Sequence, residues 1–88
     1  MNNTQRLKFI EDKLTAALQP ETLEVVDDSA EHEGHAGNGG GGHFSVTVVA
    51  KAFVGCSAIE RHKMIYAALG AAVGGEIHAL RITAKVPV

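Results

Sequence analysis

The chain has 88 residues, of which 45% are hydrophobic and 20% charged, and its formal net charge at pH 7 is −2. This length predicts one domain over residues 1–88 with a small core, since so short a chain buries roughly 60% of its unfolded surface. The length rules out most two-domain enzymes, and the composition is typical of a globular rather than a disordered protein. The charge balance argues against strong sequence-independent binding of nucleic acid, although a local basic patch stays open.

A single cysteine, Cys56, sets the expectations about compartment and metal sites. One thiol can form no internal disulfide and no cysteine-rich zinc or iron–sulfur site. The N-terminal residues lack the apolar segment of a signal peptide, and no apolar run reaches the length of a membrane-spanning helix. We therefore expect a cytoplasmic protein.

The N-terminal part predicts a helix followed by a strand. Apolar residues recur there every three or four positions, at Leu7, Ile10, Leu14 and Leu18. This spacing places them on one helical face, so residues 4–18 are predicted to be helical and to stop before Pro20. Residues 23–27 then combine apolar and β-branched side chains, which is typical of a short strand.

Residues 29–42 break this pattern. They hold six glycines, two histidines and no large apolar side chain. Such a segment cannot bury enough surface to offset its ordering entropy, so we expect a long, mobile loop that is the least ordered part of the chain. Loops of this length in compact domains are usually functional or disordered.

Strand and helix signals resume after the loop. Alternating side chains predict a strand over residues 44–49, and residues 54–56 predict a turn. Ser57 and Glu60 form a capping-box pattern, in which each side chain bonds the backbone N–H of the other residue. The helix that begins there is predicted to run to Leu69.

The C-terminal part predicts a short helical segment at residues 71–73, stopped by Gly74 and Gly75, and a last strand from Ile77 to about Lys85. The order is helix, strand, strand, helix, short helix, strand. The first two strands are sequential and favour an antiparallel pair, whereas the last strand joins after a helical crossover. We therefore predict an α+β sandwich with a three-stranded mixed sheet and its helices on one face.

No residue pattern predicts catalysis. A hydrolase or transferase needs a nucleophile beside a base, or paired carboxylates in a cleft, and neither stands out. The glycine-rich segment is followed by a strand and by no Lys-Ser or Lys-Thr pair, which argues against a phosphate-binding loop. We therefore expect a protein that is not an enzyme.

The histidines are the candidates for chemistry. His32 and His35 lie in the glycine-rich segment, His43 lies at its end, and His78 opens the last strand with the same alternation as Leu80. Their spacing leaves two interpretations open: a solvated loop with a half-buried structural histidine, or metal ligation by imidazole. His32 and His35 are too few for a closed zinc site, so any metal would need donors from elsewhere, most simply from a second protein.

Three blocks, in the right order, resemble the BolA-like protein family over nearly the whole chain. The strongest comprises residues 53–55 and 61–66, Phe-Val-Gly and Arg-His-Lys-Met-Ile-Tyr, similar to the family's F-x-G-x5-R-H-(R/K)-x-(V/I)-Y pattern. The second is Ile-His-Ala-Leu at residues 77–80. The third is Leu-Glu-Val-Val-Asp-Asp-Ser at residues 23–29, followed by the His/Gly segment and the His-Phe pair at residues 43–44. The resemblance implies a KH-like fold of class II, which agrees with the predicted element order.

The resemblance also implies a function. BolA-like proteins associate with monothiol glutaredoxins and share a bridged [2Fe–2S] cluster with them, to which glutaredoxin and glutathione contribute thiolates. This chain would then contribute His78 and one loop histidine, either His32, which matches better by its distance from Ser29, or His35. His43 is less favoured because the sheet fixes its place.

The same resemblance implies a role in iron–sulfur cluster assembly, trafficking or iron sensing. The isolated chain is expected to hold no cofactor and to be a monomer or a weak homodimer.

Cys56 lies outside the position of the loop ligand and is expected to be a small packing thiol. His62 lies on a helical face that suggests packing and a hydrogen bond.

Regulation of transcription through DNA binding is the alternative. KH-like folds bind nucleic acid, and some BolA-like proteins are described as transcriptional regulators. Arg61 and Lys63 are the candidate contacts, and Lys51, Arg81 and Lys85 could extend them into a basic patch. The G-x-x-G loop with which KH domains clamp a nucleic-acid backbone is absent, so a solvated charged face is the competing explanation.

Overall fold

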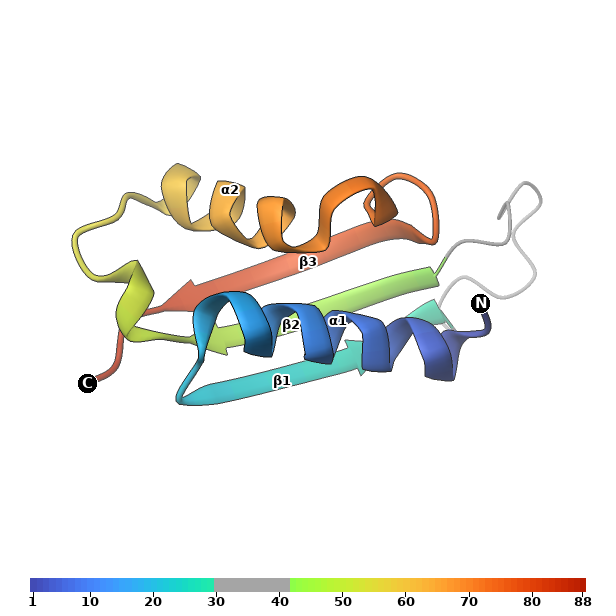
Figure 1. Cartoon of the computed structure of the whole chain (residues 1–88), viewed down its shortest axis with the longest axis horizontal. Helices are drawn as coiled ribbons and strands as arrows, with labels where there is room; N and C mark the ends of the chain where they lie inside the picture. The colour runs from blue at the N-terminus through green and yellow to red at the C-terminus, as the bar shows by residue number, and fades with distance from the viewer. Residues whose placement is uncertain (30–41) are drawn as a thin grey trace.

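The structure is a computed structural model that describes residues 1–29 and 42–88. Residues 30–41 lie outside this part, and with them most of the segment predicted to be a mobile loop. The described elements follow one another as α1 (Asn3–Leu18), β1 (Thr22–Asp27), β2 (Gly42–Val49), the 3-10 turn η2 (Lys51–Phe53), α2 (Ala58–Leu69), the 3-10 turn η3 (Gly70–Ala72) and β3 (Ile77–Lys85) (Figure 1). The predicted order of helices and strands is confirmed.

Helix α1 begins and ends where local chemistry favours it. The Gln5 N–H donates to the Asn2 side chain at 2.8 Å and the Asn2 N–H donates to the Gln5 side chain at 2.9 Å. This capping box satisfies backbone donors that the first helical turn leaves unpaired. The helix stops after Leu18, and Gln19 adopts a left-handed conformation with φ of 46° just before Pro20.

The predicted capping box of α2 is confirmed. The Glu60 N–H donates to the Ser57 hydroxyl at 3.1 Å, and the Ser57 N–H donates to the Glu60 carboxylate at 2.8 Å. The second of these bonds holds the pKa of Glu60 below its usual range, because it stabilises the charged form.

Neither α1 nor α2, the two α-helices of the described residues, is long and apolar enough to cross a membrane.

The sheet has the strand order β1-β2-β3, with β1 antiparallel and β3 parallel to the central strand. This arrangement confirms the predicted three-stranded mixed sheet. Because β2 and β3 are parallel, their first residues lie at the same end of the sheet, and β1 ends there too (Figure 1). Three segments that are distant in the sequence therefore meet at this end.

The pairing of β2 with β3 contains one irregularity at this end. Gly42 pairs with Ile77, but the next residue of β2, His43, pairs with Ala79, so β3 carries one extra residue, His78. Ile77 is fully buried, whereas His78 and Ala79 are both exposed. A bulge of this kind re-aims a side chain. The expectation that His78 lies on the same face of the strand as Leu80 is therefore wrong, because His78 is exposed and Leu80 is partly buried.

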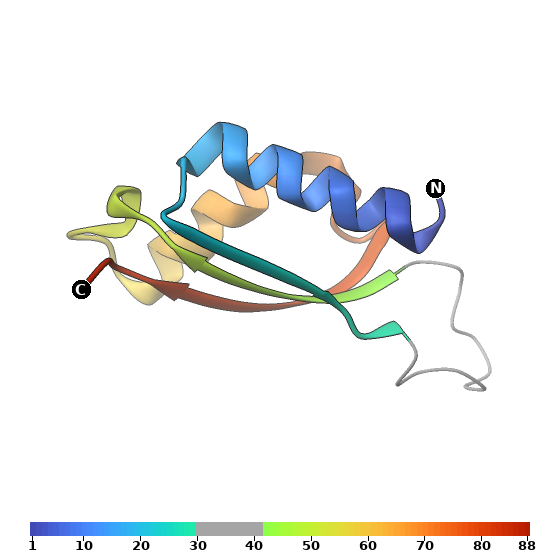
Figure 2. The ribbon, with the colours of Figure 1, turned by 90° about the horizontal axis from the view of Figure 1, so that it is seen from below.

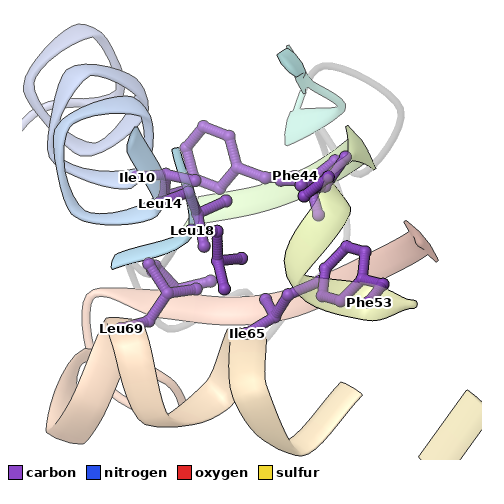
Figure 3. Packing of buried hydrophobic residues seen from close by; sticks show 11 residues of the cluster. Ile10, Leu14, Leu18, Phe44, Phe53, Ile65 and Leu69 are labelled. Carbon is purple, nitrogen blue, oxygen red and sulfur yellow. The ribbon is translucent and has the colours of Figure 1, made fainter. Parts of the chain in front are cut away.

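Both helices pack on one face of the sheet, and no described element covers the opposite face (Figure 2). Apolar side chains of α1, α2 and one face of β2 point toward one another between the layers (Figure 3). The fully or almost fully buried residues of this core are Ile10, Leu14, Leu18, Phe44, Val46, Val48, Ala50, Phe53, Ile65, Leu69 and Ile77. The open face consequently carries the other residues of β2, among them His43 and Ser45.

An ion pair ties the start of β3 to α1. The Glu76 carboxylate accepts a hydrogen bond from Arg6 Nε at 2.7 Å and lies 3.5 Å from the N-terminal ammonium. The hydrogen bond from Arg6 holds the pKa of Glu76 below its usual range. The Glu76 carbonyl also accepts the Gly42 N–H at 3.0 Å. Glu76 thus fixes the backbone two residues before His78.

Candidate functional site

Two imidazoles lie side by side at the end of the sheet where β2 and β3 begin. The ring centroids of His43 and His78 are 5.0 Å apart, and the ring planes are inclined by 49°. His43 is half-buried and His78 is exposed. The parallel pairing of the two strands brings these residues together, and the bulge turns His78 toward His43.

The N–H and the carbonyl of His43 are both held by the two residues that follow β1. Its N–H donates to the Ser29 hydroxyl at 3.1 Å, and its carbonyl accepts the Asp28 N–H at 2.7 Å. Ser29 is held in turn, because its N–H donates to the Asp27 carboxylate at 2.9 Å. The Ser45 hydroxyl donates to the Asp28 carboxylate. The imidazole of His43 therefore projects from a fixed backbone.

Both histidines line an open hollow of about 480 Å³. Asp28, Ala79 and Arg81 belong to the same lining. The hollow thus combines two imidazoles with one carboxylate and one guanidinium. Imidazole is a metal ligand in its neutral form, and the hollow is open to solvent.

The donor set fits half of an iron–sulfur site. Two imidazoles that bind one tetrahedral metal ion, through nitrogens about 2.1 Å from it, have ring centroids about 5 Å apart, as observed for His43 and His78. Within residues 1–29 and 42–88, however, no three His, Cys, Asp or Glu side chains could hold a metal ion together. A [2Fe–2S] cluster takes four ligands, so a cluster bound at this hollow would need its other ligands from outside the described residues.

The loop histidines singled out from the sequence, His32 and His35, lie outside the described residues. Ser29, three positions before His32 in the sequence, lies at the same end of the sheet as the hollow, where it bonds His43. Of the three histidines predicted as ligands, only His78 belongs to the described residues. His43, which was not favoured as a ligand, lies beside it.

Cys56 and His62 lie away from this hollow. The Cys56 thiol donates to the Ala52 carbonyl at 3.7 Å and lies 4.0 Å from Met64 Sδ. Most of the length of β2, roughly 20 Å at 3.3 Å per residue, separates this thiol from His43. His62 is half-buried on α2. Neither side chain lines the hollow.

Arg61, one of the two candidate nucleic-acid contacts, is engaged within the fold. Its Nε donates to the Cys56 carbonyl at 3.1 Å, and its Nη1 donates to the Ala84 carbonyl at 3.2 Å. The side chain is partly buried and connects the start of α2 to the end of β3. Its guanidinium therefore stabilises the packing of α2 against the sheet.

The other basic residues do not gather on one face. Lys63 is exposed on α2, in the helical layer, whereas Arg81 and Lys85 alternate with the partly buried residues of β3 and lie on the open face of the sheet. Lys51 lies 3.9 Å from the Glu21 carboxylate. A nucleic acid bound to either face could therefore contact only some of these basic side chains with its phosphates.

Sequence reasoning did not anticipate the pairing of His43 with His78. It disfavoured His43 because the sheet fixes its position, and the same constraint places it beside His78. The sequence did contain one indication of this pair. A helical crossover was predicted between the last two strands, and two parallel strands begin at the same end of a sheet.

Comparison with known proteins supports the family resemblance. The family model described as BolA-like protein matches residues 14–88. BolA-like protein 1 from Homo sapiens is 44% identical over 78 residues, which cover 89% of this chain and 56% of the human protein. The DNA-binding transcriptional regulator BolA from Escherichia coli is 44% identical over 73 residues, which cover 83% of this chain and 68% of that protein. The chain thus spans little more than half the length of the human relative.

A solved structure shares the same fold. The BolA domain of SufE1 from Arabidopsis thaliana aligns with a TM-score of 0.81 and 41% identity, over 93% of this chain and 92% of that domain. The matched residues of the family model include both His43 and His78 and all three strands. The chain therefore belongs to the BolA-like protein family.

Proposed function

We propose that this chain acts in the cytoplasm as a partner of a monothiol glutaredoxin and supplies histidine ligands to a [2Fe–2S] cluster shared by the two proteins. The observation that carries this proposal is the pair of imidazoles, His43 and His78, 5.0 Å apart in an open hollow. The role is in assembly or trafficking of iron–sulfur clusters, or in iron sensing, and it requires no catalysis by this chain.

An incomplete ligand set favours a shared site. The hollow is open, and its two imidazoles offer at most two of the four ligands that a [2Fe–2S] cluster takes. Thiolates of glutaredoxin and glutathione would supply the others. The one thiol of this chain, Cys56, lies at the other end of the sheet and leaves that role to the partner.

His78 is the first ligand in this proposal, because its neighbours Ile77 and Ala79 are both paired with β2 while its imidazole is exposed. The second ligand is a loop histidine, His32 or His35, or the adjacent His43. His32 is favoured by its distance from Ser29 in the sequence, and His43 by its place beside His78.

Histidine ligation would give the shared cluster distinct properties. Two imidazoles in place of two thiolates on one iron remove negative charge and raise the reduction potential, as in Rieske centres. Imidazole must also be neutral to bind, so acidification should release the cluster from this chain. Such ligands suit transfer or sensing better than permanent storage.

Reconstitution tests the proposal directly. The protein is mixed with a monothiol glutaredoxin, glutathione, ferrous iron and sulfide, and the products are separated by gel filtration with visible absorbance. We expect a coloured heterodimer, whereas this chain treated alone should stay colourless. A mixture in which all colour elutes with glutaredoxin homodimers, or a coloured species formed by this chain alone, contradicts the proposal.

DNA binding is the second candidate function, because the Escherichia coli relative is named a DNA-binding transcriptional regulator. We expect weak binding, with a dissociation constant of about a micromolar or more and little sequence preference, because the basic residues are divided between two faces. Fluorescence titration at physiological salt with a promoter fragment and a scrambled duplex checks this. Nanomolar affinity for the promoter alone would reverse the order of the two functions.

A further inference from the structure

Arg81 is a chemically distinct part of the hollow that holds the two histidines. It lies on the open face of the sheet, where it pairs with Ser45 of β2 and lies two residues along β3 from Ala79, the partner of His43. Two residues of a strand span about 7 Å, so the guanidinium stem begins about that far from the imidazole pair. A ligand in the hollow can therefore reach both groups.

The charges in the hollow are not balanced against one another. The Asp28 carboxylate already accepts a hydrogen bond from the Ser45 hydroxyl. Arg81 is exposed and makes no hydrogen bond or ion pair with any described residue. An incoming ligand thus meets, next to two imidazoles, a guanidinium that has no counter-ion among residues 1–29 and 42–88. A planar guanidinium binds carboxylates through two parallel hydrogen bonds, which adds geometric selectivity to charge.

We propose that Arg81 is a recognition residue that binds a carboxylate carried by the partner's half of the shared site. This inference rests on the proposed function. Glutathione is one source of this carboxylate. Its glycine carboxylate lies one residue, about 4–7 Å, beyond the cysteine whose thiolate would bind iron. This span is comparable to the distance between the imidazole pair and Arg81. An acidic side chain of glutaredoxin is the other source of the same chemistry.

The test compares Arg81→Gln with Lys85→Gln, a matched control on the same strand and the same face, about 13 Å farther from the histidines. The measured quantity is the glutathione concentration that gives half-maximal visible circular dichroism of the reconstituted heterodimer. We expect Arg81→Gln to raise it about tenfold, the size of one exposed charge-assisted contact, and Lys85→Gln to leave it unchanged. Arg81→Lys should recover part of the loss, and added salt should weaken wild type more than Arg81→Gln.

Two further measurements separate the sources of the carboxylate. If glutathione supplies it, replacing glutathione by its glycine monoethyl ester weakens the wild-type complex as much as Arg81→Gln does and has no added effect on that variant. If glutaredoxin supplies it, Arg81→Gln weakens the heterodimer without cluster or glutathione, as measured by calorimetry. Either result supports the inference.

The contrary results are equally distinct. A wild-type protein that forms no coloured heterodimer overturns the proposed function, and this inference with it. A wild-type protein that does form one, together with an Arg81→Gln variant that is indistinguishable from it, overturns the inference alone. The inference also fails if Arg81→Gln weakens only DNA binding, because the guanidinium would then serve phosphate recognition.

Discussion

His78→Ala is expected to abolish, or strongly change, the visible circular dichroism of the cluster reconstituted with glutaredoxin. His78 is the exposed imidazole of the hollow, and the strand around it is held by the pairing of Ile77 and Ala79 with β2 and by the bond from the Gly42 N–H to the Glu76 carbonyl. A ligand whose backbone is already ordered loses less entropy when the partner arrives, so its removal should cost more than removal of a loop ligand.

The fold should survive this change, because substitutions of exposed side chains usually alter the free energy of unfolding by no more than about 0.5 kcal/mol. His62→Ala is the matched control, since it removes a histidine that does not line the hollow. We expect its visible spectrum to be that of the wild type. Thermal unfolding followed by far-ultraviolet circular dichroism checks that both variants are folded.

Single and combined variants of the other histidines identify the second ligand. Loss of His32 alone should be milder than loss of His78, and loss of His32 and His35 together should approach it. If His43 supplies the second nitrogen, His43→Ala will instead reproduce the His78→Ala spectrum by itself. A wild-type spectrum for His78→Ala, with a spectrum destroyed by a loop variant, would show that rigidity does not decide ligand strength.

Gly42→Ala should lower the free energy of unfolding by about 1–3 kcal/mol, the usual cost of overpacking a core. A Cβ at this position would clash with Cε2 of the Phe44 ring and lie 3.1 Å from the Asn3 side chain. The Phe44 ring is 2% exposed and packed in the core, so it cannot move aside without displacing other side chains. Urea denaturation gives the difference in free energy.

Gly75→Ala is the matched control for this substitution. Its Cβ would meet only the Ala71 and Ala72 carbonyls at 3.7 Å, an ordinary contact, and its backbone does not require glycine. We expect a change within about 0.5 kcal/mol, because less entropy in the unfolded chain offsets small local costs. Equal losses for both variants would mean that the loss of glycine itself, rather than the clash with the Phe44 ring, sets the cost. Gly42→Ala should also weaken cluster binding, because Gly42 immediately precedes His43 and a shift of its backbone would move the imidazole.

Short-range physics made much of this protein predictable from its sequence. The apolar spacing of α1, the Ser57–Glu60 capping box and the span Ile77–Lys85 of β3 each depend on residues only a few positions apart. The motif blocks around Arg61 and His78 likewise indicated the family, and with it the fold. Each of these signals is contained in one segment, so no knowledge of the pairing between segments was needed.

Tertiary structure decided what depends on pairing between distant segments. The register of β2 against β3 creates the bulge, which reverses the face expected for His78, and their parallel direction places His43 beside it. The same packing engages Arg61 with the Ala84 carbonyl, although its charge alone suggested a nucleic-acid contact. Alternation along one strand carries no information about an extra residue opposite another strand, so the His43–His78 pair could be recognised only once the sheet was assembled.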